Sequence, residues 1–177
     1  MNTGQMLLTL GALGLLSLAV LNLNTSINQN DVSLAQNRYR LEALSLITSY
    51  IEQARALYFD EVTTDTTLAK LKTTFSLVLQ SEPNDSGRFD DFDDFNNYVT
   101  VDTGLSGVEY KVMFKVEYVQ LQGDSFKHSA SREWHKLMTI SVTDNYPTEP
   151  LLFRTYGSEK IRDTLRVSFL NSYWFYN

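Results

Sequence analysis

The stretch MNTGQMLLTLGALGLLSLAVLNLN, residues 1–24, opens the chain, and no residue from Met6 to Leu23 carries a charge. As a helix, this run of about 18 residues would span about 27 Å, close to the roughly 30 Å of bilayer hydrocarbon. It matches a secretory signal peptide poorly, because no Lys or Arg precedes Arg38 and residues 18–23 form a poor cleavage site. We therefore expect this segment to be a working part of the protein that can also hold a membrane.

The composition narrows the class of protein. With 177 residues, the chain has room for one modest domain and one long element. The net charge of -6 provides no basic face for a phosphate backbone, so we expect no nucleic-acid partner. Because the chain has no cysteine, disulfides, thiolate zinc sites and cysteine nucleophiles are excluded.

A helical pattern continues beyond the apolar run. After a polar, uncharged stretch at 22–30, charged residues such as Arg38, Arg40 and Glu52 are expected opposite an apolar stripe. No proline precedes Pro83, so the sequence predicts one nearly continuous helix over about residues 2–59. The apolar stripe consists of Leu34, Leu41, Leu44, Ile47, Ile51, Ala54 and Tyr58.

Two interpretations of the weak points in this helix stay open. Gly and Asn are poor helix formers, so residues 11–30 could unwind. Alternatively, Gly11 and Gly14 offer small surfaces for close helix packing.

The rest of the chain predicts a small antiparallel sheet. A short helix is expected from about Thr66, with Leu68, Leu71, Phe75 and Leu79 on one face, and then a loop over 81–98. Strict alternation over 108–118 predicts a half-buried strand, and further strands are expected at 134–142 and 151–156. The fold class is therefore α+β, with a sheet that packs on the C-terminal half of the long helix.

The C-terminal tail allows two readings. Leu165, Val167 and Phe169 alternate as in a last strand that completes the core. The other reading is an exposed aromatic subunit interface, since aromatic residues are enriched at interface centres. That interface would consist of Tyr173, Trp174, Phe175 and Tyr176.

Few residues support chemistry, and we expect no enzyme. His128 and His135 have no metal-ligand spacing, and no phosphate loop or nucleophile elbow is present in the sequence. One cluster of acids has ligand chemistry, and it is either a solvated or capping loop or a calcium site. Its members are Asp90, Asp91, Asp93 and Asp94.

Together these features resemble type IV pilins and the pseudopilins of type II secretion. GQMLLTLGALGLLSLAVL is similar to pilin N-termini that assemble through the helix, and FDDFDDFNNY (89–98) and MTISVTD resemble segments of pilin-like heads. The family usually has Glu at the fifth mature position and Pro near position 22, where this chain has Gln5 and Asn22.

The resemblance implies a division into a hydrophobic half-helix, 1–30, and a globular head, 31–177, that contains an amphipathic half-helix, 31–59, and a sheet, 107–177. It implies a pilus subunit that passes from the cytoplasmic membrane into an extracellular filament, with copies of itself and the pilus or secretion assembly machinery as partners. The filament core would involve Met1, Gln5, Leu8, Gly11, Leu13, Gly14, Leu16 and Val20. Alternatives are a minor pilin or pseudopilin and a single-pass anchored binding domain, and no cofactor is expected apart from the calcium considered above.

Overall fold

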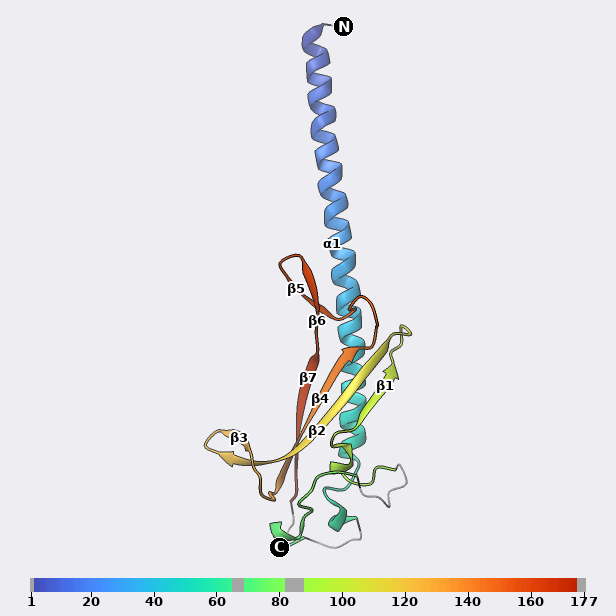
Figure 1. Cartoon of the computed structure of the whole chain (residues 1–177). Coiled ribbons are helices and arrows are strands. Elements are labelled where there is room, and N and C mark those ends of the chain that lie inside the picture. Colours follow the sequence, from blue (N-terminus) through green and yellow to red (C-terminus); the bar gives the residue numbers. More distant parts are fainter. Residues whose placement is uncertain (1, 65–68, 82–87, 175–177) are drawn as a thin grey trace. The chain divides into compact units, whose positions relative to one another are not determined.

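The computed structural model describes residues 2–64, 69–81 and 88–174. Helix α1, Thr3–Arg55, comes first in the chain, and antiparallel strands follow it (Figure 1). The predicted α+β class is therefore confirmed. The strands are β1 Val99–Thr103, β2 Glu109–Gln122, β3 Ser125–His128, β4 His135–Asp144, β5 Phe153–Tyr156, β6 Glu159–Arg162 and β7 Leu165–Ser172.

The chain divides into two compact units, Met1–Tyr39 and Arg40–Asn177. In the first unit, the described residues from Thr3 onward are helical, and those from Asn2 to Leu34 are exposed. The helix is continuous through 11–30, so the glycines and asparagines do not interrupt it. Among the described residues, α1 is the one helix that is long and apolar enough to cross a membrane, judged by length and composition.

The second unit is built on a sheet of order β1-β2-β4-β7, with β3 paired to the far end of β2. β5 and β6 form a separate hairpin. The alternation predicted for 108–118 is confirmed in β2, where Tyr110, Val112 and Phe114 are buried and Glu109 and Lys111 are exposed. The register sets Phe114 opposite Ile140, and Ile140 opposite Val167, so apolar side chains from three strands share one face.

The part of α1 in the second unit buries Ile47 and Ala54 of the predicted stripe, together with Ala43, which lies outside that stripe. By contrast, Leu41 is 67% exposed and Leu44 is 39% exposed. Small alanine side chains let the sheet approach closely, and the larger leucines of the predicted stripe are left outside. Tyr50 is also on the sheet side, with its ring 5.0 Å from that of Phe114.

The helix is shorter than predicted, because the chain leaves it after Arg55. The amide of Tyr58 donates to Asp90 O over 3.1 Å, and Tyr58 forms an isolated bridge with Asp91. This pairing holds residue 58 in an extended connection rather than in a further helical turn.

The helix predicted from Thr66 is also wrong over its described part. Residues 65–68, including Leu68, lie outside the described residues, and 69–81 contain only a single 3-10 turn, Lys72–Thr74. Leu71 is exposed and Phe75 is buried, so the two do not share a packed helical face. The amide of Ser76 donates to the carboxylate of Asp60, and this contact fixes the backbone without a helix.

An aromatic cluster closes the core at the end of the sheet where β7 ends. Buried Phe59, Phe75 and Tyr118 pack with the partly buried Trp134 and Tyr173. The Phe75 ring lies 5.0 Å from that of Phe59 and 5.3 Å from that of Trp134. The prediction of a last strand in the tail is confirmed by β7, and Tyr173 directly after it completes the core.

Gly104 offers a test of this packing. A Cβ at this position would lie 2.7 Å from Tyr110 Cε2 and 2.7 Å from Glu42 Oε2, and the Tyr110 ring is fully buried. We expect Gly104→Ala to lower the free energy of unfolding by about 1–3 kcal/mol, as overpacking does. Urea unfolding of the full chain in detergent, monitored by tryptophan fluorescence, measures the change in the free energy of unfolding.

The control is Leu105→Ala, because Leu105 is 98% exposed and should change stability by less than about 0.5 kcal/mol. Equal unfolding midpoints for Gly104→Ala and wild type would contradict the packing described around Tyr110.

Candidate functional site

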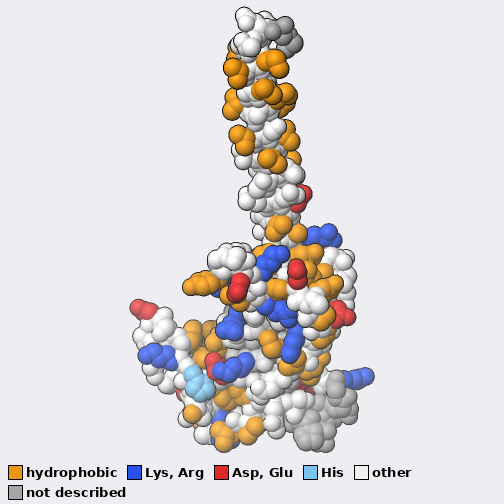
Figure 2. All heavy atoms as spheres, turned by 45° about the horizontal axis from the view of Figure 1, so that its top comes forward, with side chains coloured by type: hydrophobic (Ala, Val, Ile, Leu, Met, Phe, Trp, Pro, Cys, Tyr) orange, Lys and Arg blue, Asp and Glu red, His pale blue; other side chains and the backbone are white. Residues whose placement is uncertain are grey.

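The first candidate site is the surface of α1 in the first unit. Figure 2 shows orange hydrophobic side chains along the N-terminal stretch of the helix, with no blue or red side chains among them. Leu7 is 71% exposed and Leu8 is 76% exposed. An apolar surface of this extent in water carries a large free-energy cost and marks an interaction with lipid or protein.

One face of this helix is hollowed by small residues. No atom lies within 4 Å of a Cβ built on Gly4, Gly11 or Gly14, so each leaves open space at the surface. A shallow apolar groove results, lined by Gly4, Leu7, Leu8, Gly11, Ala12 and Leu15. Close approach of a second helix needs this kind of surface.

The residues predicted to form a filament core lie on different faces of this helix. Gln5, Leu8, Leu13, Leu16 and Val20 are all exposed. Leu8 and Gly11 share the groove, whereas Met1 lies outside the described residues. The described members therefore present apolar contacts around the helix rather than along a single line.

The second candidate site is a buried lysine in the head. Lys136 is 0% exposed and lies on the inward face of β4 together with Met138 and Ile140. Its Nζ donates to Phe59 O over 2.7 Å and to Asp60 Oδ2 over 2.8 Å, and it also contacts Asp93 Oδ1. These three acceptors match the three donors of an ammonium group.

Asp60 holds the chain around this lysine. Its carboxylate accepts hydrogen bonds from the amide of Ser76 and from the hydroxyl of Tyr118, the latter over 3.3 Å. The same side chain caps the 3-10 helix Glu61–Thr63. Asp60 therefore links the segment that follows α1 to the aromatic cluster.

The acidic segment is folded into the protein. The prediction of a solvated loop holds only for Asp90. Asp91, Asp93 and Asp94 are buried, and Asp90 is exposed. Asp91 Oδ1 accepts from the amides of Asp93 and Asp94, and Asp94 Oδ2 accepts from those of Asp90 and Asp91. The capping reading is confirmed, because these bonds fix the 3-10 turn Asp93–Phe95.

Burial changes the acidity of these groups. Desolvation, followed by the charge of Asp93, raises the pKa of Asp91 to about 8. Desolvation raises the pKa of Asp93 to about 6 although Lys136 lowers it. Desolvation and the nearby Asp60 also raise the pKa of Tyr118. The cluster therefore keeps a proton on a carboxyl group at neutral pH.

The calcium prediction involves the same segment. Within residues 2–64, 69–81 and 88–174, no group of three or more His, Asp or Glu side chains is arranged to hold a metal ion. The ammonium of Lys136 contacts Asp93 directly. Calcium binding by Asp90, Asp91, Asp93 and Asp94 stays a prediction.

The aromatic end of the chain is divided between core and surface. Tyr173 packs in the cluster, and its hydroxyl accepts from the amide of Ala69 over 3.1 Å. Trp174 is 75% exposed beside a hollow of about 210 Å³ that Trp134, His135 and Tyr173 also line. Phe175 and Tyr176 lie outside the described residues. A subunit interface at this end stays a prediction, with Trp174 as its exposed described member.

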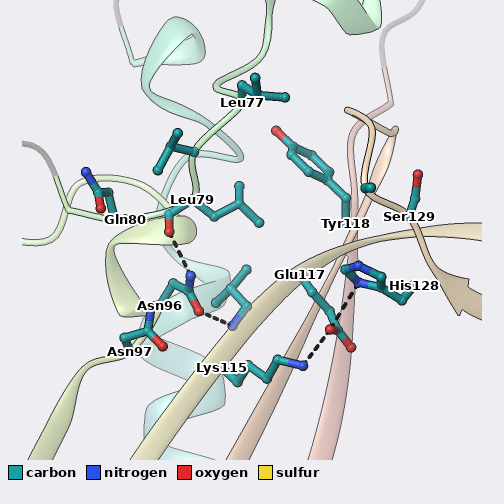
Figure 3. A pocket seen from close by; sticks show the side chains of 13 residues that line it. Leu77, Leu79, Gln80, Asn96, Asn97, Lys115, Glu117, Tyr118, His128 and Ser129 are labelled. Carbon is teal, nitrogen blue, oxygen red and sulfur yellow. Dashed lines mark hydrogen bonds and ion pairs between the residues drawn. The ribbon is translucent and has the colours of Figure 1, made fainter.

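An open groove of about 580 Å³ lies beside β2 and β3 (Figure 3). Asn96 fixes one wall, because its Nδ2 donates to Leu79 O and its Oδ1 accepts from the amide of Val116. Glu117 is paired with Lys115 at 2.7 Å and with His128 at 3.2 Å. His128 is the last residue of strand β3.

Sequence reasoning missed Lys136 and Asp60. A signal for Lys136 was present, since the alternation of HKLMTISVTD sets it in phase with Met138, Ile140 and Val142. No local pattern indicated Asp60, which lies 76 positions from Lys136 in the chain.

Comparison with protein families, curated proteins and solved structures gives no match for this chain. The layout of a long apolar N-terminal helix and an antiparallel sheet is compatible with a pilin-like fold.

The protonated state of Asp91 predicts a pH dependence of stability. Its pKa is about 8 in the folded chain and about 3.9 when unfolded, so the folded state binds more protons between these values. The Asp91 contribution to the free energy of unfolding should therefore fall as pH rises from about 4 to about 8. Urea unfolding at a series of pH values should show this fall, and Asp91→Asn should make it shallower.

The matched control is Asp90→Asn, since Asp90 is exposed and should leave the pH profile unchanged. A profile for Asp91→Asn as steep as that of wild type would contradict the assignment.

Calcium is tested separately by thermal unfolding of the full chain with and without a chelator. A bound ion stabilises only the folded state, so chelation should lower the melting temperature. The double substitution Asp91→Asn with Asp93→Asn should remove that sensitivity. Identical wild-type melting curves with and without chelator would rule the ion out.

Proposed function

We propose that the chain is a structural subunit of an extracellular filament of the type IV pilus kind. The observation that carries the proposal is the uncharged helix surface from Met6 to Leu23, which is exposed over its whole length. Such a surface needs an apolar environment, and a bundle of identical helices supplies one outside a membrane. Before assembly, the cytoplasmic membrane supplies it.

The small residues favour a packed bundle over a plain anchor. Lipid responds mainly to hydrophobicity, whereas neighbouring helices interdigitate at near-crystalline density and so respond to shape. The open surface at Gly11 and Gly14 gives a neighbour room for backbone approach. Repetition of one such head-to-tail contact generates an open helical polymer.

Other residues are available for contacts in the assembled state. The resemblance to pilins implies that Gln5 faces a neighbour's N-terminal amine, with which a neutral amide can form a hydrogen bond. Exposed Leu41 and Leu44 in the second unit, and Trp174 at its end, offer apolar surface to adjacent heads. The pilus or secretion assembly machinery would extract the subunit from the membrane.

The double substitution Gly11→Leu with Gly14→Leu tests the proposal. Both changes keep the helix apolar, so membrane insertion should be preserved, but the added side chains occupy the space that a neighbouring helix needs. We expect filament yield to fall at least tenfold. The measurement is immunoblotting of membrane and sheared-filament fractions from cells expressing each variant.

Leu15→Ile is the matched control, because it keeps volume and hydrophobicity on the same helix, and it should assemble normally. Wild-type filament yield from the double-leucine variant would make a single-pass anchored domain the better account. A short, low-copy assembly in wild-type cells would instead indicate a minor pilin or pseudopilin.

A further inference from the structure

Lys136 and Asp93 bring an amine and a carboxyl group into direct contact in a dry, aromatic site. Both residues are 0% exposed. The Nζ atom contacts Asp93 Oδ1 and lies 4.6 Å from the centre of the Phe59 ring and 5.5 Å from that of Tyr118. The carboxyl carbon of Asp93 is one bond beyond the contacted oxygen. The nucleophile and its target are therefore held in contact and out of reach of bulk solvent.

A second carboxyl group, that of Asp91, lies beside Asp93. Asp91 Oδ1 accepts from the amide of Asp93 over 2.8 Å, and burial and the charge of Asp93 raise the pKa of Asp91, so this neighbouring group holds a proton. No hydrogen-bond donor in the described parts of the chain reaches Asp91 Oδ2 or Asp93 Oδ2. A proton held between the two groups satisfies these buried oxygens.

We propose that Lys136 and Asp93 become joined by an intramolecular isopeptide bond, with Asp91 as the proton donor and acceptor. The ammonium of Lys136 first passes one proton to the carboxylate of Asp93. The freed lone pair of Nζ then attacks the carboxyl carbon, and the C–N bond forms. The carboxyl hydroxyl takes a proton from Asp91 and leaves as water, and Asp91 recovers a proton from the nitrogen.

The reaction needs no oxidant, reductant or activated co-reactant, because an amine and a carboxylic acid give an amide and one water. Bulk water opposes this condensation, and the site contains two features that offset it. Burial makes the charged pair costly relative to the neutral amide, and the fixed contact removes the entropy of encounter.

The bond would tie the acidic segment to the central strand β4, across 43 positions of the chain. Because the chain has no cysteine, it has no disulfide with which to make such a closure. A covalent closure restricts the unfolded chain and raises the melting temperature in the way a disulfide does.

Peptide mapping of the full chain, purified from membranes in detergent, tests the proposal. Trypsin cuts after Arg88, Lys111, Arg132 and Arg154, so Asp93 falls in segment 89–111 and Lys136 in segment 133–154. We expect a branched product of these two segments, uncut after Lys136, whose mass is their sum less one water. Separate peptides 89–111 and 137–154 as the only products would overturn the proposal.

Variants locate the bond. Asp93→Asn should release ammonia in place of water and so give a branched product of the same mass as wild type. Asp91→Ala should lower the branched fraction at least tenfold, while Asp90→Ala, at an exposed position, should leave it unchanged. A branch from Lys136 to segment 56–70, which contains Asp60, would contradict Asp93 as the acceptor. Full branching in Asp91→Ala would contradict the role of Asp91.

Discussion

The buried ammonium of Lys136 is the contact on which the head depends. It binds the Phe59 carbonyl and Asp60 just after α1, and it contacts Asp93 in the acidic segment. Two stretches that are far apart in the chain therefore meet on strand β4. A single lysine faces several buried carboxyl groups, so part of their charge must be neutralised by protons, by an ion or by covalent bonding. This excess of acid is the chemical feature that sets the site apart from an ordinary ion pair.

In the first unit the constraint is exposed apolar surface, whereas in the head it is buried charge. From Met6 to Leu23 the first unit carries no charge, and its side chains are exposed. The same surface suits lipid and a bundle of identical helices, and a subunit that moves from a membrane into a filament needs both. The glycine-lined groove distinguishes the two environments, because lipid fills any shape whereas a neighbouring helix must fit.

Sequence patterns predicted the parts of the fold that local periodicity controls. Alternation located β2, a further strand was expected where β4 lies, and the uninterrupted apolar run located the N-terminal part of α1. The buried helix face was predicted in part: Ile47 and Ala54 are buried as expected, whereas the sheet packs on the small Ala43 and leaves the more hydrophobic Leu41 and Leu44 exposed. The inward turn of the aspartates depends on Lys136, which is distant in the chain, so the acidic run by itself resembles a solvated loop. The candidate site could therefore not be predicted from local patterns, because its residues come together only in the folded chain.

Negative-stain electron microscopy of material sheared from the cell surface, with mass spectrometry of the purified fibres, tests the central claim most directly. The account predicts long, uniform fibres in which this chain, with its N-terminal apolar segment intact, is the predominant protein. Recovery of the chain only in the membrane fraction, under conditions in which it is well expressed, would contradict it.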